Sequence, residues 1–213
     1  MGKRLGQAVA LGTLLVSVGA WPAEGPAITV RVYDRAGIPE AALEQAKEET
    51  GRILRKTGVE THWVNCPAKG QRDPACDTEV APAEARLRIL PLQGPSKTGQ
   101  VLGAALALGE GRFGNLATVF YGGVDEMAGG ERLLARRLLG YAIAHELGHL
   151  LLGPGSHSES GIMMAQWKEK ALKGAPKASF LFTRREAERV RDAVTARMLA
   201  AQARIPVVTA AAP

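Results

Sequence analysis

Residues 138–152 form an almost wholly apolar segment that nonetheless contains two histidines and a glutamate. A helical pattern that begins near Glu131 becomes apolar on nearly every side here, so we expect a helix buried in the centre of the fold. Gly153 and Pro154 end it, the glycine as a left-handed cap and the proline as a breaker. Buried ionisable groups need partners, because leaving them unpaired is costly. The fold must therefore provide partners for these buried polar side chains.

The buried polar residues are His145, Glu146 and His149. Positions i and i+4 lie on one face of a helix, so both imidazoles can reach the same metal ion. Zinc binds neutral histidine nitrogens, and catalytic zinc sites combine three protein ligands with a water. Glu146 can take a proton from a zinc-activated water and pass it to a leaving amine. The pattern predicts a zinc hydrolase with Glu146 as general acid/base; a pair of satisfied core histidines is the alternative interpretation.

The third ligand must come from beyond the helix. His157 follows a turn through Pro154 and Gly155, and we predict that this turn brings it back to the metal. Glu159 and the more distant Glu169 are alternative ligands. A histidine without a metal role is the remaining interpretation of His157.

The stretch from His145 to Met164 resembles the zinc motif of the metzincin clan of metallopeptidases. That motif is HExxHxxGxxH, followed by a turn that holds a methionine beneath the metal. Here the glycine is displaced by one residue, to Gly153, and the third histidine by two, to His157. The resemblance implies a zinc-dependent endopeptidase with one catalytic Zn²⁺ ion, a peptide or protein substrate, and Met163 as the Met-turn residue.

The order of predicted elements is also similar to that of the metzincin catalytic domain. Alternating polarity predicts strands at residues 28–33, 59–65, 85–92, 101–108 and 116–121, and intervals of three and four predict helices at residues 39–57, 131–152 and 183–201. We expect an α+β fold, in which a five-stranded, mixed, twisted sheet packs on the active-site helix and flanking helices. Residues 24–203 would form one catalytic domain, with the substrate extended along the strand at 101–108.

The first twenty residues have the layout of a secretory signal peptide. Lys3 and Arg4 precede an apolar run over residues 5–18, and small residues stand at a possible cleavage site after Ala20. The run is shorter than the roughly 20 residues that cross a bilayer, which favours cleavage over a permanent anchor. We expect a secreted, periplasmic or cell-envelope protein with no membrane span in the mature chain. The aperiodic residues 204–213 would form a flexible tail.

Export would account for part of the positive charge. The chain has 27 basic and 21 acidic residues, a formal net charge of +6. Cleavage after Ala20 removes two basic residues and no acidic one, so the charge falls to +4. The densest basic group, at residues 184–191, is interleaved with acids and forms neither a basic stripe nor an aromatic stacking platform. This pattern is typical of a solvated helix face, so we expect no nucleic-acid partner.

The two cysteines, Cys66 and Cys76, are ten positions apart. In an oxidising compartment they would form a disulfide that closes a short loop. A thiolate metal site is the alternative, but the chain lacks both CxxC spacing and further cysteines.

Other residues near the motif give weaker indications. Gln166 and Trp167 are predicted to line the pocket for the substrate residue after the scissile bond, although Trp167 also fits a plain core position. Tyr141 lies one helical turn before His145 and is interpreted as packed core. The serines after the helix show no sign of an activated nucleophile.

Two other functions fit the same residues. One is a non-catalytic exported zinc-binding module, which a fourth protein ligand around the metal would favour. The other is a zinc hydrolase that acts on a non-peptide amide or ester, because HExxH specifies the nucleophile and leaves the substrate open. The sequence makes no prediction about the oligomeric state.

Overall fold

The computed structural model describes residues 25–67, 73–92, 101–106, 114–167 and 177–203. The predicted signal peptide, the predicted tail and the alternative ligand Glu169 lie outside the described residues. The strands are β1 (Ala27–Asp34), β2 (Glu60–Asn65), β3 (Glu84–Leu90), β4 (Gly103–Ala105) and β5 (Leu116–Phe120). The helices are α1 (Glu40–Arg55), α2 (Pro74–Asp77), α3 (Tyr121–Ala128), α4 (Arg132–Leu152), the 3₁₀ helix η1 (Lys177–Phe180) and α6 (Arg184–Ala203).

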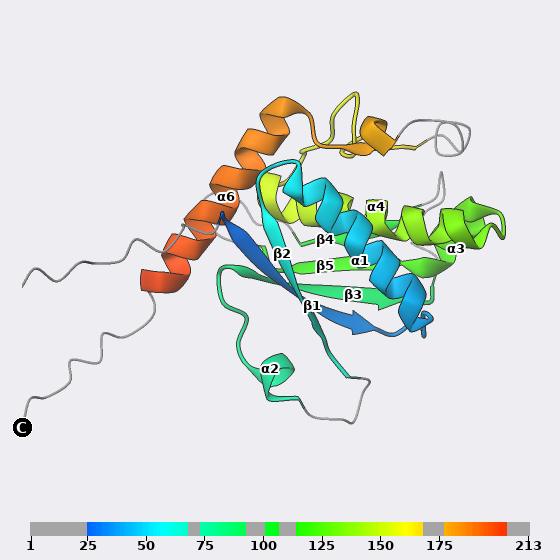
Figure 1. Cartoon of the computed structure of the whole chain (residues 1–213), viewed down its shortest axis with the longest axis horizontal. Coiled ribbons are helices and arrows are strands. Elements are labelled where there is room, and N and C mark those ends of the chain that lie inside the picture. The colour runs from blue at the N-terminus through cyan, green and yellow to red at the C-terminus, as the bar shows by residue number, and fades with distance from the viewer. Residues whose placement is uncertain (1–24, 68–72, 93–100, 107–113, 168–176, 204–213) are drawn as a thin grey trace, which may run out of the picture.

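The five strands form one sheet in the order β2-β1-β3-β5-β4 (Figure 1). Strands β2, β1, β3 and β5 run parallel to one another, and β4 pairs antiparallel with β5 at the edge. The predicted mixed, five-stranded sheet is therefore confirmed. Among the described residues β4 has a strand neighbour on one side only, so it forms an edge of the sheet.

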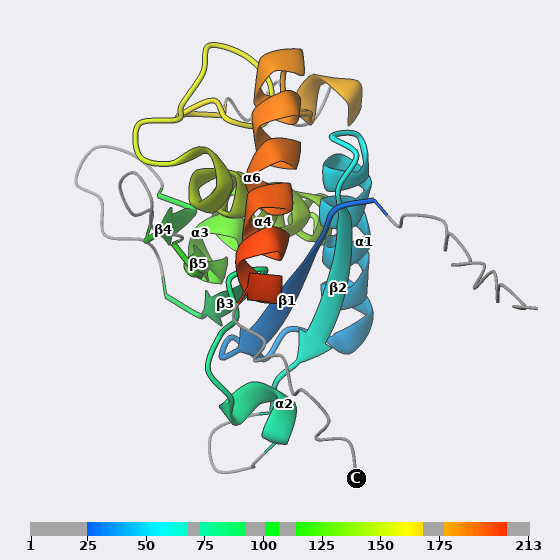
Figure 2. The same ribbon diagram turned by 90° about the vertical axis from the view of Figure 1, so that its left-hand side faces the viewer.

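Helix α4 lies in the middle of the molecule, packed against α1, α6 and the strands β4 and β5 (Figure 2). Gly140 lets α1 approach α4 closely, since a Cβ at this position would stand 2.8 Å from the carbonyl oxygen of Ala46. At the same crossing the Thr50 hydroxyl donates to the carbonyl of Gly140 at 3.0 Å. Neighbours on several sides explain why α4 is apolar nearly all round.

Two arginines of α6 hold the end of α4. The last carbonyls of a helix have no partner within it. The buried guanidinium of Arg197 donates to the carbonyl of Leu150 at 2.6 Å, and Arg189 donates to that of Leu152 at 2.7 Å. A capping box starts α6 itself: the backbone N–H of Thr183 donates to Glu186 at 2.7 Å, and that of Glu186 to the Thr183 hydroxyl at 3.4 Å. Helix α6 thus fixes the point where the chain leaves α4.

Between residues 101 and 128 the structure differs from the sequence prediction. Residue 121 begins helix α3 instead of ending a strand, and β4 spans three residues of the predicted strand at 101–108. Helix α3 is short and contains Gly122 and Gly123, which are poor helix formers, so its pattern gives no helical signal. Gly122 is required by packing, because a Cβ there would lie 2.9 Å from the carbonyl oxygen of Pro91.

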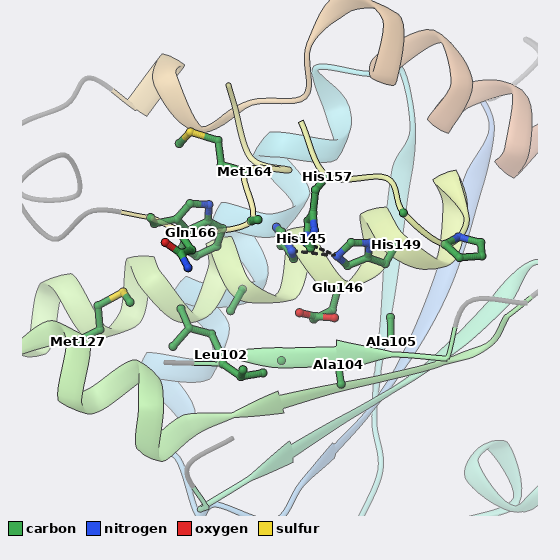
Figure 3. A pocket seen from close by; sticks show the side chains of 17 residues that line it. Leu102, Ala104, Ala105, Met127, His145, Glu146, His149, His157, Met164 and Gln166 are labelled. Atoms are coloured by element: carbon green, nitrogen blue, oxygen red, sulfur yellow. Dashed lines mark hydrogen bonds between the residues drawn. The ribbon is translucent and has the colours of Figure 1, made fainter. Parts of the chain in front are cut away.

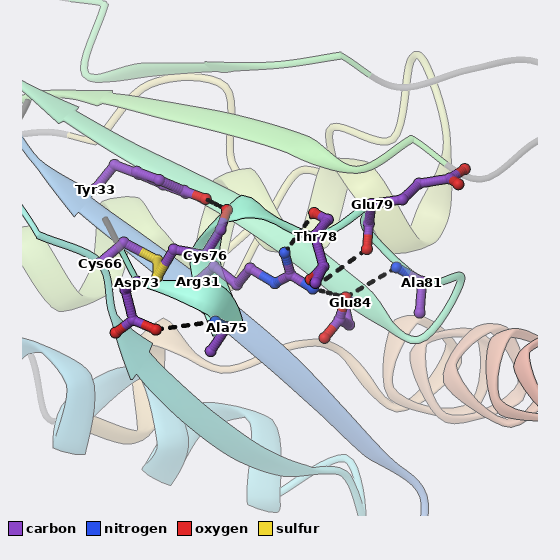
Figure 4. A network of polar contacts seen from close by, with 10 residues as sticks. All are labelled: Arg31, Tyr33, Cys66, Asp73, Ala75, Cys76, Thr78, Glu79, Ala81 and Glu84. Carbon is purple, nitrogen blue, oxygen red and sulfur yellow. Dashed lines mark hydrogen bonds and ion pairs between the residues drawn. A yellow bond between two sulfur atoms is a disulfide. The ribbon is translucent and has the colours of Figure 1, made fainter. Parts of the chain in front are cut away.

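The predicted disulfide between Cys66 and Cys76 is present and holds the loop that contains α2 (Figure 4). The Tyr33 hydroxyl donates to the carbonyl of Cys76 at 2.9 Å. Next to it, the buried Arg31 pairs with Glu84 and donates to the carbonyls of residues 78 and 79. Such a disulfide is typical of proteins in oxidising compartments. None of the described helices combines the length and the apolar character needed to span a membrane.

Candidate metal centre

A histidine triad is present at the C-terminal half of α4 (Figure 3). His145 and His149 are one turn apart on the helix, and His157 follows the turn after it. Nε2 of His149 lies 3.0 Å from Nε2 of His145 and 3.1 Å from Nε2 of His157. One ring nitrogen from each histidine falls within 4.8 Å of the others, a spacing that could hold a metal ion.

Two glycines return the chain to the helix after α4. Gly153 has φ +90° and Gly155 has φ +68°, conformations that residues with a Cβ rarely adopt. The longer turn expected from the displaced motif is thus compatible with His157 reaching the other two histidines. Glu159 is exposed and does not belong to the group, within the part of the chain that the structure describes.

The imidazole of His145 is held by the segment that follows the triad. Its Nδ1 lies 2.8 Å from the carbonyl oxygen of Ile162. A carbonyl only accepts hydrogen bonds, so Nδ1 carries the proton and Nε2 keeps its lone pair. Metal-binding histidines are commonly oriented in this way by their second nitrogen.

Burial keeps the helix histidines neutral. It lowers the pKa of His145, although the Ile162 carbonyl acts in the opposite direction. Burial, followed by the neighbouring His145 and His157, lowers the pKa of His149 to about 4. A metal ion binds only the unprotonated nitrogen of a histidine, so both rings are ready as ligands at neutral pH.

Glu146 projects from α4 towards β4 (Figure 3). Its Oε2 atom is buried and has no hydrogen-bond partner. Burial raises the pKa of this carboxyl group to about 8, because the charged form loses its hydration. A buried carboxyl oxygen without a partner beside three imidazoles is unusual, since buried polar groups are ordinarily hydrogen-bonded. Such an atom is a candidate partner for a bound cation or water.

The two methionines after the triad have different surroundings. Met163 is fully buried, and a Cβ built on Gly148 of α4 would stand 2.5 Å from its sulfur. Met164, for which the sequence predicts no role, lines the cavity at the histidines. The backbone N–H of Ser158 donates to the carbonyl of Met163 at 3.0 Å and fixes the turn between them. Met163 thus packs against α4 in the turn where the sequence predicts a Met-turn.

A cavity of about 650 Å³ opens in front of the histidines and Glu146. Its walls come from β4, α3, α4 and the segment after His157, and include the predicted pocket residues Gln166 and Trp167. Leu102 and Met127 also line it. Sequence reasoning missed Met127 because it lies on α3, the helix without a recognisable pattern.

Tyr141 does not line this cavity and belongs to the core, as predicted from the sequence. The side chain is 2% exposed, and its ring stacks on Phe180 at a centroid distance of 4.8 Å. Trp167 stands edge-on to both Tyr141, at 6.2 Å, and His145, at 5.5 Å. Tyr141, Phe180 and Trp167 therefore connect the core to the wall of the cavity.

Comparison with known proteins gives matches among solved structures only. No protein-family model matches the sequence, and no curated protein matches it significantly. Among solved structures, the fold is similar to the crystal structure of metalloproteinase-II from Bacteroides fragilis, with a TM-score of 0.51 and 13% sequence identity. The match covers 81% of this chain and 55% of the other, so this chain spans little more than half of that protein's length. At this identity the likeness is one of fold.

Proposed function

We propose that the protein is a zinc-dependent metalloendopeptidase of metzincin type. One observation carries the proposal: three histidine nitrogens converge at the wall of an open cavity, beside the buried carboxyl group of Glu146, whose Oε2 atom has no hydrogen-bond partner. The fold shared with a bacterial metalloproteinase supports the same conclusion.

The donor set fits zinc. Imidazole nitrogens suit this metal, and two of them bound at about 2.0–2.1 Å in a tetrahedral site would stand roughly 3.3 Å apart. Two of the nitrogen pairs in the triad are separated by 3.0 and 3.1 Å. No fourth His, Cys, Asp or Glu joins the triad within the described residues, which favours a catalytic site over a closed structural one.

Glu146 would act as general acid/base. Bound zinc supplies Lewis acidity that lowers the pKa of a coordinated water towards about 7. Glu146 takes the proton from the attacking water and then delivers it to the nitrogen of the leaving amine. The cation would also stabilise the ionised carboxylate in a place where burial alone disfavours it.

Strand β4 would bind the substrate backbone. It borders the cavity at the sheet edge, and an extended peptide can pair with such an edge by backbone hydrogen bonds. The apolar walls around Gln166 and Trp167 would take the side chain that follows the scissile bond. Met163 would be the Met-turn residue and would pack against the metal site without binding the metal, since a thioether packs adaptably.

The remaining parts of the proposal concern the chain as a whole. Residues 1–20 would direct export and be cleaved, and residues 24–203 would form the catalytic domain. The disulfide supports an oxidising compartment outside the cytosol. N-terminal sequencing of the protein recovered from the cell envelope or medium should begin close to residue 21; a chain that still begins at Met1 would contradict cleavage.

The deciding experiment compares the wild type with Glu146→Gln, an uncharged side chain of the same shape. Both should bind one zinc ion, and only the wild type should cleave a peptide library. Glu159→Gln, which removes an exposed carboxylate nearby, is the matched control and should cleave normally. Removal of zinc with 1,10-phenanthroline should abolish cleavage, and added zinc should restore it.

The outcomes separate the competing functions. Equal cleavage by wild type and Glu146→Gln would contradict the mechanism. Zinc binding without cleavage of peptides, small amides or esters would indicate a non-catalytic module. Cleavage of amides or esters alone would indicate another class of zinc hydrolase.

A further inference from the structure

We infer that Ser156 is a positioning residue for His149: its hydroxyl accepts a hydrogen bond from Nδ1 of the imidazole and so leaves Nε2 free for the metal. The inference rests on the zinc site proposed above. It adds to that site a residue outside the HExxH motif, from a serine-containing segment that showed no catalytic signal in the sequence.

The contact between the two side chains is direct. Oγ of Ser156 lies 2.9 Å from Nδ1 of His149, and both residues are half-buried. Ser156 belongs to the turn between α4 and His157, whereas His149 belongs to the helix. The hydrogen bond therefore ties the turn to the face of α4 that carries the triad.

The direction of this hydrogen bond follows from the other ring nitrogen. Nε2 of His149 faces the Nε2 atoms of His145 and His157, at 3.0 and 3.1 Å. A neutral imidazole has one N–H, and the nitrogen that binds a cation cannot carry it. The proton must then lie on Nδ1, and the Ser156 oxygen is the acceptor that holds it there.

His145 is supported in a different way. Its Nδ1 donates to the backbone carbonyl of Ile162, which no side-chain substitution removes. The support of His149 is a side-chain hydroxyl and can be deleted by one substitution. The two ligands on α4 thus allow a clean test, because one keeps its partner while the other loses it.

The turn after α4 determines where the hydroxyl lies. Gly153 and Gly155 both have positive φ, and the chain between them bends back towards the helix. Consecutive residues then meet the same imidazole: Ser156 through its Oγ and His157 through its Nε2. The lengthened turn therefore places His157 beside the other two histidines and Ser156 within hydrogen-bond distance of His149.

The neighbouring Ser158 provides a matched control. Its hydroxyl donates to the carbonyl of Ser160 at 2.8 Å and not to a histidine of the triad. Ser158→Ala removes the same atom from the same segment, two residues away, without touching the support of His149.

The experiment measures the zinc dissociation constant of the full chain by competition with a chromogenic chelator. Ser156→Ala should bind zinc about 10- to 100-fold more weakly than wild type, the usual effect of losing such a partner. Ser156→Thr, which keeps the hydroxyl, should restore most of the affinity, and Ser158→Ala should match wild type. Equal affinity of Ser156→Ala and wild type would overturn the inference.

A second measurement needs no metal. Long-range ¹H–¹⁵N spectra of the zinc-free wild type should show the proton of His149 on Nδ1, and Ser156→Ala should shift the ring towards the Nε2–H form. A wild-type ring protonated mainly on Nε2 would overturn the inference even if Ser156→Ala did not fold. A wild type that binds no zinc would instead contradict the proposed function, so the two failures are distinguishable.

Discussion

The backbone of Gly103 on β4 lies directly against the carboxylate of Glu146 on α4. A Cβ at residue 103 would stand 2.6 Å from Cδ of Glu146, well inside van der Waals contact. The backbone of β4 is held in place from its other side by pairing with β5. Glycine at this position therefore allows the sheet edge and the carboxyl group to share one wall of the cavity.

Gly103→Ala should lower the rate of peptide cleavage at least about 100-fold while one zinc ion stays bound. Either the carboxylate or the edge strand must move, and a displacement of about 1 Å at a catalytic group has an effect of this size. Gly25→Ala is the control, because its Cβ would make an ordinary 3.5 Å contact with the Gly58 carbonyl. Zinc content and kcat/KM of both variants test the prediction, and an unchanged kcat/KM for Gly103→Ala would contradict it.

His157→Ala should weaken zinc binding more than the loss of a supporting residue does, which is about 10- to 100-fold. The protein would keep His145 and His149 but lose the third nitrogen of the triad. Glu159→Ala should bind zinc like wild type, since the exposed carboxylate is not part of the group. Metal analysis after dialysis against a weak chelator distinguishes the variants. The reverse result would identify Glu159 as the third ligand.

Arg197→Met should lower the free energy of unfolding by about 2–4 kcal/mol, because buried carbonyls lose a charged donor. The guanidinium donates to Leu150 at 2.6 Å and to Gly114 at 2.9 Å. Burial lowers its pKa to about 10, so it remains charged at neutral pH. Arg184→Met, at an exposed ion pair with Glu188, should change stability by less than about 0.5 kcal/mol. Urea unfolding compares the two; equal losses would contradict the role of Arg197.

Tyr141→Phe should make stability less sensitive to alkaline pH. Burial, followed by the nearby Glu49, raises the pKa of Tyr141 above its usual value of 10.0. Between the unfolded and folded pKa values the unfolded state has lost a proton that the folded state retains. The free energy of unfolding therefore falls as pH rises through that range. Urea unfolding at pH 8 to 11 should show a flatter pH dependence for Tyr141→Phe, and identical slopes would contradict this.

The double variant Cys66→Ser, Cys76→Ser should lose about 2–3 kcal/mol of stability, because the unfolded loop of ten residue positions is no longer closed. Zinc affinity should not change, since the disulfide and α2 lie away from α4 (Figure 1). Urea unfolding and zinc titration of the same sample measure both effects. If the fully folded double variant bound zinc more weakly than wild type, the loop would influence the metal centre and the prediction would be wrong.

Local pattern was sufficient for most of the fold. Alternating polarity located the parallel strands, and the apolar stripe located α1, because these periods follow from backbone geometry. The local pattern did not predict α3, because a helix of eight residues with two glycines shows no recognisable period. Consequently Met127, which lines the cavity from α3, could not be predicted.

The sequence by itself determined that His145 and His149 share one face of a buried helix beside Glu146, because i and i+4 geometry is a property of any α-helix. Only the tertiary structure decided what surrounds them. It brought His157 and Ser156 to His149 through two positive-φ glycines, and placed Gly103 of a distant strand against Glu146. The reason is that these contacts join separate elements, and their distances depend on how strands, turns and helices pack against one another.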